Sequence, residues 1–192
     1  MRLLLSSVLL VTACVAPTAA DDEGDPGEEL GSTESLATVT RCHLSAREIL
    51  DRASGSRRAA IARGLEWLED DVPYSQTRTH EGYRTDCSGF VSMCWQLGTS
   101  FSTADFAASS SKWKPLPSYE SLVPGDALVR RVSGQGHIVL FVGWDDDSHD
   151  GACVLEQAST ASDMQLRVRT VSSLRKSSFK PIASTKLAGA RR

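Results

Sequence analysis

The order of sequence patterns along the chain constrains its fold more than any other feature. Up to Leu97 the periodicity is helical, because apolar residues recur at spacings of three and four between Ala60 and Leu68. Short apolar runs then follow a Pro-Gly turn at 124–125, and they end with a short run at 179–184. Helices followed by a meander of strands indicate an α+β fold, in which helices pack on an antiparallel sheet of about five strands.

Composition limits the classes of protein that fit this pattern. The 192 residues suffice for one ordinary domain, and 41% of them are hydrophobic, enough for a real core. A formal net charge of −3 argues against a dedicated nucleic-acid binder. The five cysteines include no CxxC pair, which argues against a zinc ribbon. We expect a monomer that uses no metal or other cofactor.

The N-terminal residues are typical of an export signal. A basic Met1-Arg2 start precedes a short apolar run that ends at Val11-Thr12-Ala13-Cys14, which resembles a bacterial lipobox. We therefore predict a lipoprotein signal peptide at 1–13 and a lipid anchor on Cys14, with ordinary secretion and cleavage near Ala20 as the alternative. The protein would then be held at the membrane of the bacterial cell envelope.

Two further regions follow the predicted anchor. Residues 14–38 are acidic, rich in Pro and Gly, and lack apolar periodicity, so they are predicted to form a disordered tether. Residues 39–192 would form the folded domain, which carries all the candidate catalytic residues described below. Its last part, after Asp163, contains eight basic residues and no acidic one. This part would be a solvated basic face or a surface toward an anionic cell wall or membrane.

A candidate nucleophile stands at the start of the run Cys87–Leu97, which has the pattern of a buried helix. Asp86 precedes it as a helix N-cap, so Cys87 falls in the first turn, where the helix dipole favours a thiolate. Ser88 and Gly89 are small and would allow another element or a substrate to approach. The simpler alternative is a buried structural cysteine.

A thiol nucleophile needs a base and a group that orients the base. Of the four histidines, only His137 begins an apolar strand, where it would be held rigidly. Two polar residues on the next strand could orient it, and alternation puts them on opposite faces. If Leu155 marks the core face, Gln157 points inward, and we prefer it to Glu156.

Several motifs in order resemble those of the NlpC-type cell-wall cysteine peptidases, which have a papain-like fold. The resemblance covers about Ile61 to Gln157. The matching segments are Val72-Pro73-Tyr74, Asp86-Cys87-Ser88-Gly89-Phe90-Val91, Leu122-Val123-Pro124-Gly125-Asp126, Gly136-His137-Ile138-Val139 and Gln157-Ala158.

The resemblance implies a cysteine hydrolase that cleaves amide bonds in peptidoglycan stem peptides, with a triad of Cys87, His137 and Gln157. It also implies that Tyr74 stabilises the oxyanion and that Asp86 and Ser88 hold the substrate's amine. Two departures leave the bond cleaved open. Ser75-Gln76 replaces the usual Gly-Gly, and Leu155-Glu156-Gln157 is also similar to CHAP-type amidohydrolases, in which an acidic residue can be third.

Alternatives remain for the function and for the other cysteines. A catalytically silent envelope-binding lipoprotein and an acyl or amide transferase are the competing functions. Cys94 is interpreted as a core residue, with a disulfide to Cys42 or Cys153 as the alternative. A metal site built from Cys87, His137 and Cys153 would lack a fourth ligand.

One group of aromatic residues belongs to none of these motifs. Residues 99–118 look irregular or partly helical, and three aromatic residues in this segment are candidates for the wall of a groove. They are Phe101, Phe106 and Trp113.

Overall fold

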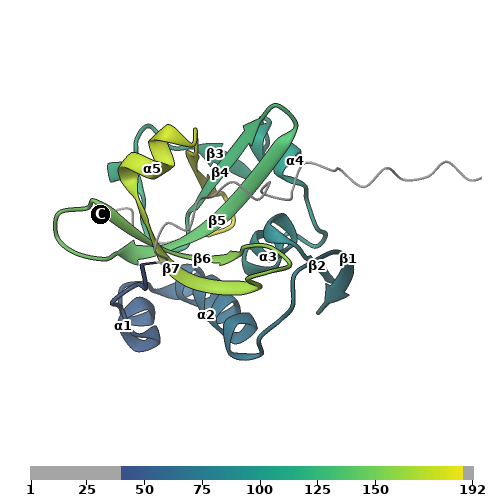
Figure 1. Cartoon of the computed structure of the whole chain (residues 1–192), viewed down its shortest axis with the longest axis horizontal. Helices are drawn as coiled ribbons and strands as arrows, with labels where there is room; N and C mark the ends of the chain where they lie inside the picture. Colours follow the sequence, from purple (N-terminus) through teal and green to yellow (C-terminus); the bar gives the residue numbers. More distant parts are fainter. Residues whose placement is uncertain (1–39, 188–192) are drawn as a thin grey trace, which may run out of the picture.

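A six-stranded antiparallel sheet forms the centre of the computed structural model (Figure 1), which describes residues 40–187. The predicted signal peptide, Cys14 and the tether lie outside the described residues. The helices are α1 (Ala46–Asp51), α2 (Gly55–Glu69), α3 (Cys87–Cys94), α4 (Thr103–Ala107), the 3₁₀ turn η1 (Tyr119–Ser121) and α5 (Val171–Lys176). The strands are β1 (Ser75–His80), β2 (Tyr83–Thr85), β3 (Trp113–Pro115), β4 (Ala127–Val132), β5 (Gln135–Trp144), β6 (Gly151–Gln157), β7 (Met164–Thr170) and β8 (Lys180–Ser184).

Both faces of the sheet are buried. The strand order is β3-β8-β4-β5-β6-β7, and the pairing of Leu140 with Leu155 fixes the register of β5 on β6. Ile138, Leu140 and Leu155 share a hydrophobic cluster with α2 and α3, whereas Val139 and Phe141 belong to a second cluster with α5 and η1. Figure 1 shows these helices on opposite sides of the sheet. The strands therefore read as nearly continuous apolar runs.

The helices form where capping residues and apolar spacing agree. Ser45 and Glu48 make a capping box at the start of α1, and the Asp86 side chain caps α3. Every residue of α3 is buried, so each large apolar side chain there contributes about 1.5–3 kcal/mol to the free energy of folding.

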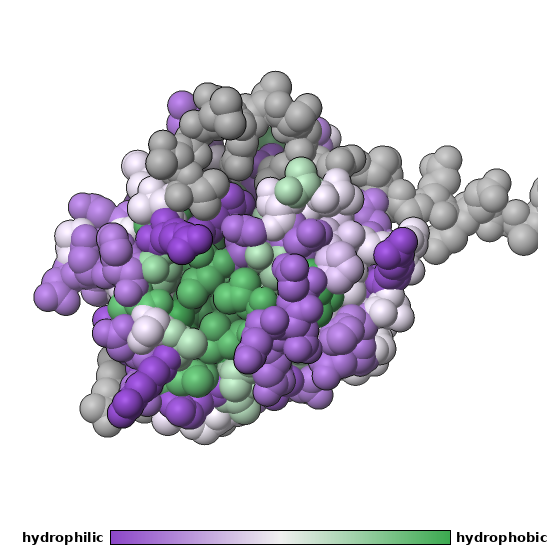
Figure 2. Space-filling model, turned by 60° about the horizontal axis from the view of Figure 1, so that its bottom comes forward, coloured by the Kyte–Doolittle hydropathy of each residue, from purple (hydrophilic) through white to green (hydrophobic). Residues whose placement is uncertain are grey.

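Apolar side chains gather on the face seen in Figure 2, the side on which α1 and α2 lie in Figure 1. No helix among residues 40–187 is long and apolar enough to cross a membrane.

A buried ion pair attaches α2 to the start of β4. Arg57 on α2 donates to Asp126 at 2.9 Å and to the Pro124 carbonyl at 3.0 Å. The other carboxylate oxygen of Asp126 accepts the Val123 N–H at 3.0 Å and closes the Pro-Gly turn. The Pro-Gly-Asp motif thus joins a helix to the sheet, which holds the strands that follow at a fixed angle to α2.

The α+β class with an antiparallel sheet is confirmed, but the predicted strand number is wrong. The sixth strand is β3, which pairs with β8 and lies in the segment predicted to be irregular. It spans only three residues at the sheet edge, which is too short for an alternating pattern to be visible. A two-stranded hairpin of β1 and β2 precedes Cys87, in a polar stretch whose sequence does not predict strands. Strand β1 is mostly exposed and polar, and β2 spans only three residues, so the sequence shows no apolar periodicity there.

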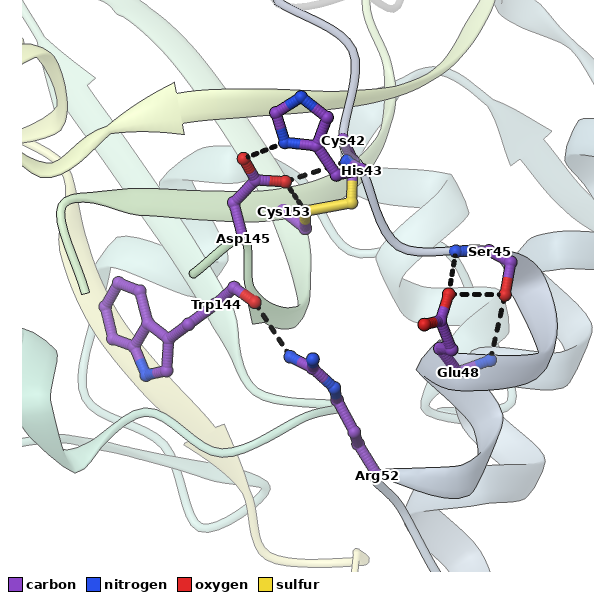
Figure 3. Close-up of a disulfide and its surroundings, with 8 residues drawn as sticks. All are labelled: Cys42, His43, Ser45, Glu48, Arg52, Trp144, Asp145 and Cys153. Atoms are coloured by element: carbon purple, nitrogen blue, oxygen red, sulfur yellow. Dashed lines mark hydrogen bonds and ion pairs between the residues drawn. A yellow bond between two sulfur atoms is a disulfide. The ribbon is translucent and has the colours of Figure 1, made fainter. Parts of the chain in front are cut away.

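A disulfide joins Cys42, just before α1, to Cys153 on β6 (Figure 3). Close to it, Asp145 accepts hydrogen bonds from the backbone N–H of His43 at 2.8 Å and pairs with the His43 ring at 2.7 Å. Cys94 is a buried thiol on α3, as interpreted from the sequence, and it takes no part in a disulfide. The cysteines predicted as possible partners of Cys94 are instead paired with each other.

The disulfide encloses a loop with a sequence separation of 111 residues, so it restricts the unfolded chain strongly. We expect the double substitution Cys42→Ser and Cys153→Ser to lower the free energy of unfolding by about 2–4 kcal/mol, measured by urea denaturation. A reductant should lower the stability of the wild type to that of the double variant and leave the double variant unchanged. Equal stability of the oxidised wild type and the double variant would contradict this expectation.

Candidate active site

Cys87 is the first residue of α3, as predicted. The Asp86 carboxylate accepts the Gly89 N–H at 2.6 Å, which satisfies one of the free donors of the first turn. Cys87 is buried and outside the disulfide, and α3 packs against β2, β5 and β6. The helix dipole favours the thiolate form at this position.

Small residues after Cys87 allow the backbone of β2 to approach α3. A Cβ atom on Gly89 would lie 2.1 Å from the Arg84 carbonyl oxygen, so no larger residue fits there without a shift of the backbone. Ser88 is fully buried, and its hydroxyl donates to Asp86 at 3.0 Å. These contacts fix the entry of the chain into α3.

The side chains predicted to hold the substrate's amine have partners within the protein. Arg84 forms a close ion pair with Asp86 and donates to the Ser88 hydroxyl at 3.1 Å. Asp86 is only 1% exposed. The Asp86 carboxylate and the Ser88 hydroxyl are therefore both bound to the Arg84 guanidinium in this arrangement.

The β1–β2 hairpin brings Tyr74 close to the residue before Cys87, the candidate nucleophile. Ser75 pairs with Thr85, so the residues next to this pair, Tyr74 and Asp86, lie across from each other at the open end of the hairpin. The Tyr74 N–H donates to Asp163 at 2.7 Å, which fastens this segment to the turn after β6. Tyr74 is therefore close in space to Asp86, the residue before Cys87.

Gln157 fastens the same segment from β6. Its side-chain amide donates to the Val72 carbonyl at 2.7 Å, and its own Oε1 has no hydrogen-bond partner among the described residues. Gln157 is completely buried. It positions the Val72–Tyr74 backbone and does not contact the His137 ring by a hydrogen bond.

His137 pairs with Glu156. The two side chains are completely buried, and 2.5 Å separates Nε2 of the imidazole from Oε2 of the carboxylate. The His137 ring also makes an edge contact with Phe179, with 6.2 Å between ring centroids. His137 stands near the start of β5, three residues before Leu140, the first residue of β5 in the paired β5–β6 ladder. Its Nδ1 has no hydrogen-bond partner among the described residues.

Two arginines of β7 hold Glu156 in its ionised form. Arg169 binds it with both ends of its guanidinium, at 3.0 Å and 2.9 Å, and Arg167 makes a close ion pair with Oε1. Burial alone would raise the pKa of Glu156, but Arg169, the hydrogen bond with His137 and Arg167 hold it well below its ordinary value. Arg169 also lies over the Phe179 ring, 5.7 Å from its centroid, which fixes the guanidinium plane.

The charge of Glu156 determines the tautomer of His137. An ionised carboxylate can only accept, so the proton between the two groups lies on Nε2. Burial lowers the pKa of His137 below its ordinary value, the hydrogen bond to Glu156 opposes this effect, and the charges of Arg169 and Arg167 add to the lowering. The imidazole is therefore neutral at pH 7, with a basic lone pair on Nδ1.

The structure corrects the preference for Gln157 over Glu156 as the residue that orients His137. The ring is bound by Glu156, whereas Gln157 binds the Val72 carbonyl. The prediction assumed that only the Leu155 face is buried, but both faces carry a hydrophobic cluster. Register puts His137 on the face of Val139, which is also the face of Glu156.

Arg167 and Arg169 were missed as members of the site. Their spacing of two on a strand next to Glu156 was the available signal, because residues two apart share one face.

The other cysteines do not extend the site. Burial raises the pKa of Cys94 well above its ordinary value, which keeps this thiol protonated and unreactive. Cys42, Asp145 and Cys153 have ligand-type atoms within 4.8 Å of one another. The two sulfurs are bonded to each other, however, and a disulfide supplies no thiolate for a metal ion.

The chain matches no protein-family model, and a search of curated proteins finds no significant relative.

The site's stability should depend on the carboxylate of Glu156. We expect Glu156→Gln to lower the free energy of unfolding by about 3 kcal/mol, because it leaves two largely buried guanidinium groups, 13% and 10% exposed, without a counter-charge. Glu120→Gln is a matched control, since Glu120 pairs with Arg175 on the surface, and it should leave the stability nearly unchanged. Urea denaturation measures both, and similar effects of the two substitutions would contradict the buried network.

Acid should weaken the fold in two steps. In the folded protein the pKa of His137 is lowered, so the unfolded chain takes up the proton first as the pH falls. The contribution of neutral His137 to the free energy of unfolding is therefore present above the ordinary pKa near 6.5 and is lost as the pH falls below that value. The pKa of Glu156 is also lowered in the folded protein, so the stability that this carboxylate contributes is lost as the pH falls below its ordinary pKa of 4.5. Urea denaturation between pH 7.5 and pH 3.5 should show both steps, and His137→Gln should remove the first. A wild-type stability that rises between pH 6.5 and pH 5 would refute the assignment.

Proposed function

We propose that the protein is a cysteine hydrolase that cleaves amide bonds in peptidoglycan stem peptides, on a papain-like fold of the NlpC type. One observation carries the proposal: a buried carboxylate binds Nε2 of His137, and Nδ1 has no hydrogen-bond partner within residues 40–187. A structural histidine usually satisfies both ring nitrogens, whereas a general base needs one open. The helix that bears Cys87 packs against the two strands that bear His137 and Glu156, from the opposite face of the sheet. We infer that His137 reaches Cys87 past the start of β5, before the first β5–β6 pair.

In the proposed reaction, Nδ1 of His137 takes the proton of the Cys87 thiol, and the sulfur attacks the carbonyl carbon of the amide. The backbone N–H of Cys87 and the Tyr74 hydroxyl stabilise the oxyanion. The imidazolium then gives its proton to the leaving amine, which departs and leaves a thioester on Cys87. Water, deprotonated by His137, attacks the thioester and releases the carboxylic acid and the thiol.

Glu156 takes the third place of the triad in this proposal. The carboxylate keeps the proton on Nε2 and stabilises the imidazolium that forms during attack. An acidic third residue is also the feature that makes the sequence similar to CHAP-type amidohydrolases. The proposal therefore leaves open which amide bond of the stem peptide is cleaved.

The location that we propose agrees with the disulfide. Disulfides persist in oxidising compartments outside the cytoplasm, where peptidoglycan lies. We propose that the protein acts in the bacterial cell envelope as a monomer, held by a lipid on Cys14 through the acidic tether at 14–38.

Digestion of purified peptidoglycan, with mass spectrometry of the products, tests the function. The wild type should release stem-peptide fragments whose masses identify the cleaved bond, and Cys87→Ala should lower the rate by at least about a thousandfold, because the nucleophile is lost. Cys94→Ala is the matched control, since it removes a buried thiol from the same helix and should keep the activity. Equal digestion by the wild type and Cys87→Ala would exclude the proposed nucleophile.

The same digestion separates the alternatives. A transferase would give products joined to an added amine or peptide, and these would appear only when such an acceptor is present. An envelope-binding lipoprotein without activity would release no fragments under any condition and would leave the wild type indistinguishable from Cys87→Ala.

A further inference from the structure

A cavity of about 610 Å³ lies between α4 and the sheet edge formed by β3, β8 and β4. Its volume falls within the range of small-molecule sites. None of Cys87, His137 and Glu156 lines it, so it is separate from the candidate active site. It is lined by Phe106, Ala107, Ala108, Ser109, Ser110, Trp113, Lys114, Pro115, Val129, Arg131, Ser178, Lys180 and Ile182.

The inner walls of the cavity are aromatic and aliphatic. Phe106 and Trp113, both candidates for a groove wall from the sequence, lie against each other with 4.6 Å between ring centroids. Trp113 is held further by a hydrogen bond from its indole N–H to the Ala108 carbonyl at 3.2 Å. Val129 and Ile182 form the floor, because they lie on the sheet face that carries the first hydrophobic cluster. A rigid aromatic wall of this kind suits a flat apolar group.

The charged side chains that line the cavity are all positive. Lys180 pairs with Val129 across β4 and β8, so it lies on the same sheet face as the floor. Arg131, two residues after Val129, shares that face and donates to the Thr103 hydroxyl at 3.2 Å. Lys114 is the third basic residue, and no aspartate or glutamate lines the cavity. The cavity therefore combines a positive potential with apolar walls.

We propose that this cavity binds an organic anion with an aromatic or other flat apolar body. The apolar part would stack on Trp113 and contact Val129 and Ile182, and the anionic group would lie at Lys180 and Arg131. A neutral ligand would gain only the apolar contacts. This site is independent of the proposed hydrolase activity, because the residues of the reaction do not take part in it.

Two fluorescent probes that differ in one sulfonate group test the proposal. The anion 8-anilino-1-naphthalenesulfonate should bind the folded protein, and its neutral analogue N-phenyl-1-naphthylamine should bind more weakly. Lys180→Glu should weaken binding of the anion about tenfold (about 1.4 kcal/mol) and leave the neutral probe unaffected. Lys176→Glu makes the same change of charge on α5, away from the cavity, and should change neither affinity.

A second variant locates the apolar part of the site. Ala107 is exposed at the end of α4 and lines the cavity, so Ala107→Trp should fill it without disturbing the core and should weaken both probes. Cys87→Ala should bind both probes as the wild type does, which separates this site from the proposed function. Equal effects of Lys180→Glu and Lys176→Glu on the anion, or undiminished binding to Ala107→Trp, would overturn the proposal.

Discussion

The candidate active site depends on the buried contact between His137 and Glu156. Burying a carboxylate without a counter-charge costs several kcal/mol, and here two arginines from the next strand compensate that cost. The positive charges of the same arginines lower the pKa of His137, which disfavours the imidazolium form. The result is a carboxylate that is ionised and a histidine that is neutral, with its proton on the nitrogen that faces Glu156.

Strand β6 connects this contact to the rest of the molecule. Its first half binds the chain before α1 through the disulfide of Cys153, and its end carries Glu156 and Gln157 on opposite faces. Glu156 holds His137, while Gln157 holds the backbone just before Tyr74. Because the hairpin that follows Tyr74 leads directly into α3, one strand positions His137, the segment that ends at Tyr74 and the entry to the helix that begins with Cys87.

The sequence was sufficient to predict much of this arrangement. The α+β class, the cap by Asp86 and the core position of Cys94 followed from periodicity and helix-end chemistry, which are local properties of the chain. The placement of Cys87 and His137 on a helix start and a strand start followed in the same way.

What could not be predicted depended on the tertiary structure. The choice between Glu156 and Gln157 required knowing that the sheet is covered on both faces, which no single strand reveals. Strand β3 and the β1–β2 hairpin lack apolar alternation because they are short or exposed. The disulfide between Cys42 and Cys153 joins residues far apart in sequence, and spacing alone does not specify such a pair.

The tautomer of His137 tests the central claim most directly. Long-range ¹H–¹⁵N correlation spectra of the protein with ¹⁵N-labelled histidine distinguish protonated from unprotonated ring nitrogens, and comparison with His137→Gln assigns the signals. We expect a neutral ring at pH 7 with the proton on Nε2 and an unprotonated Nδ1. A ring protonated on Nδ1 at this pH, whether as the other tautomer or as an imidazolium, would contradict the role of Glu156 and leave Cys87 without its proposed base.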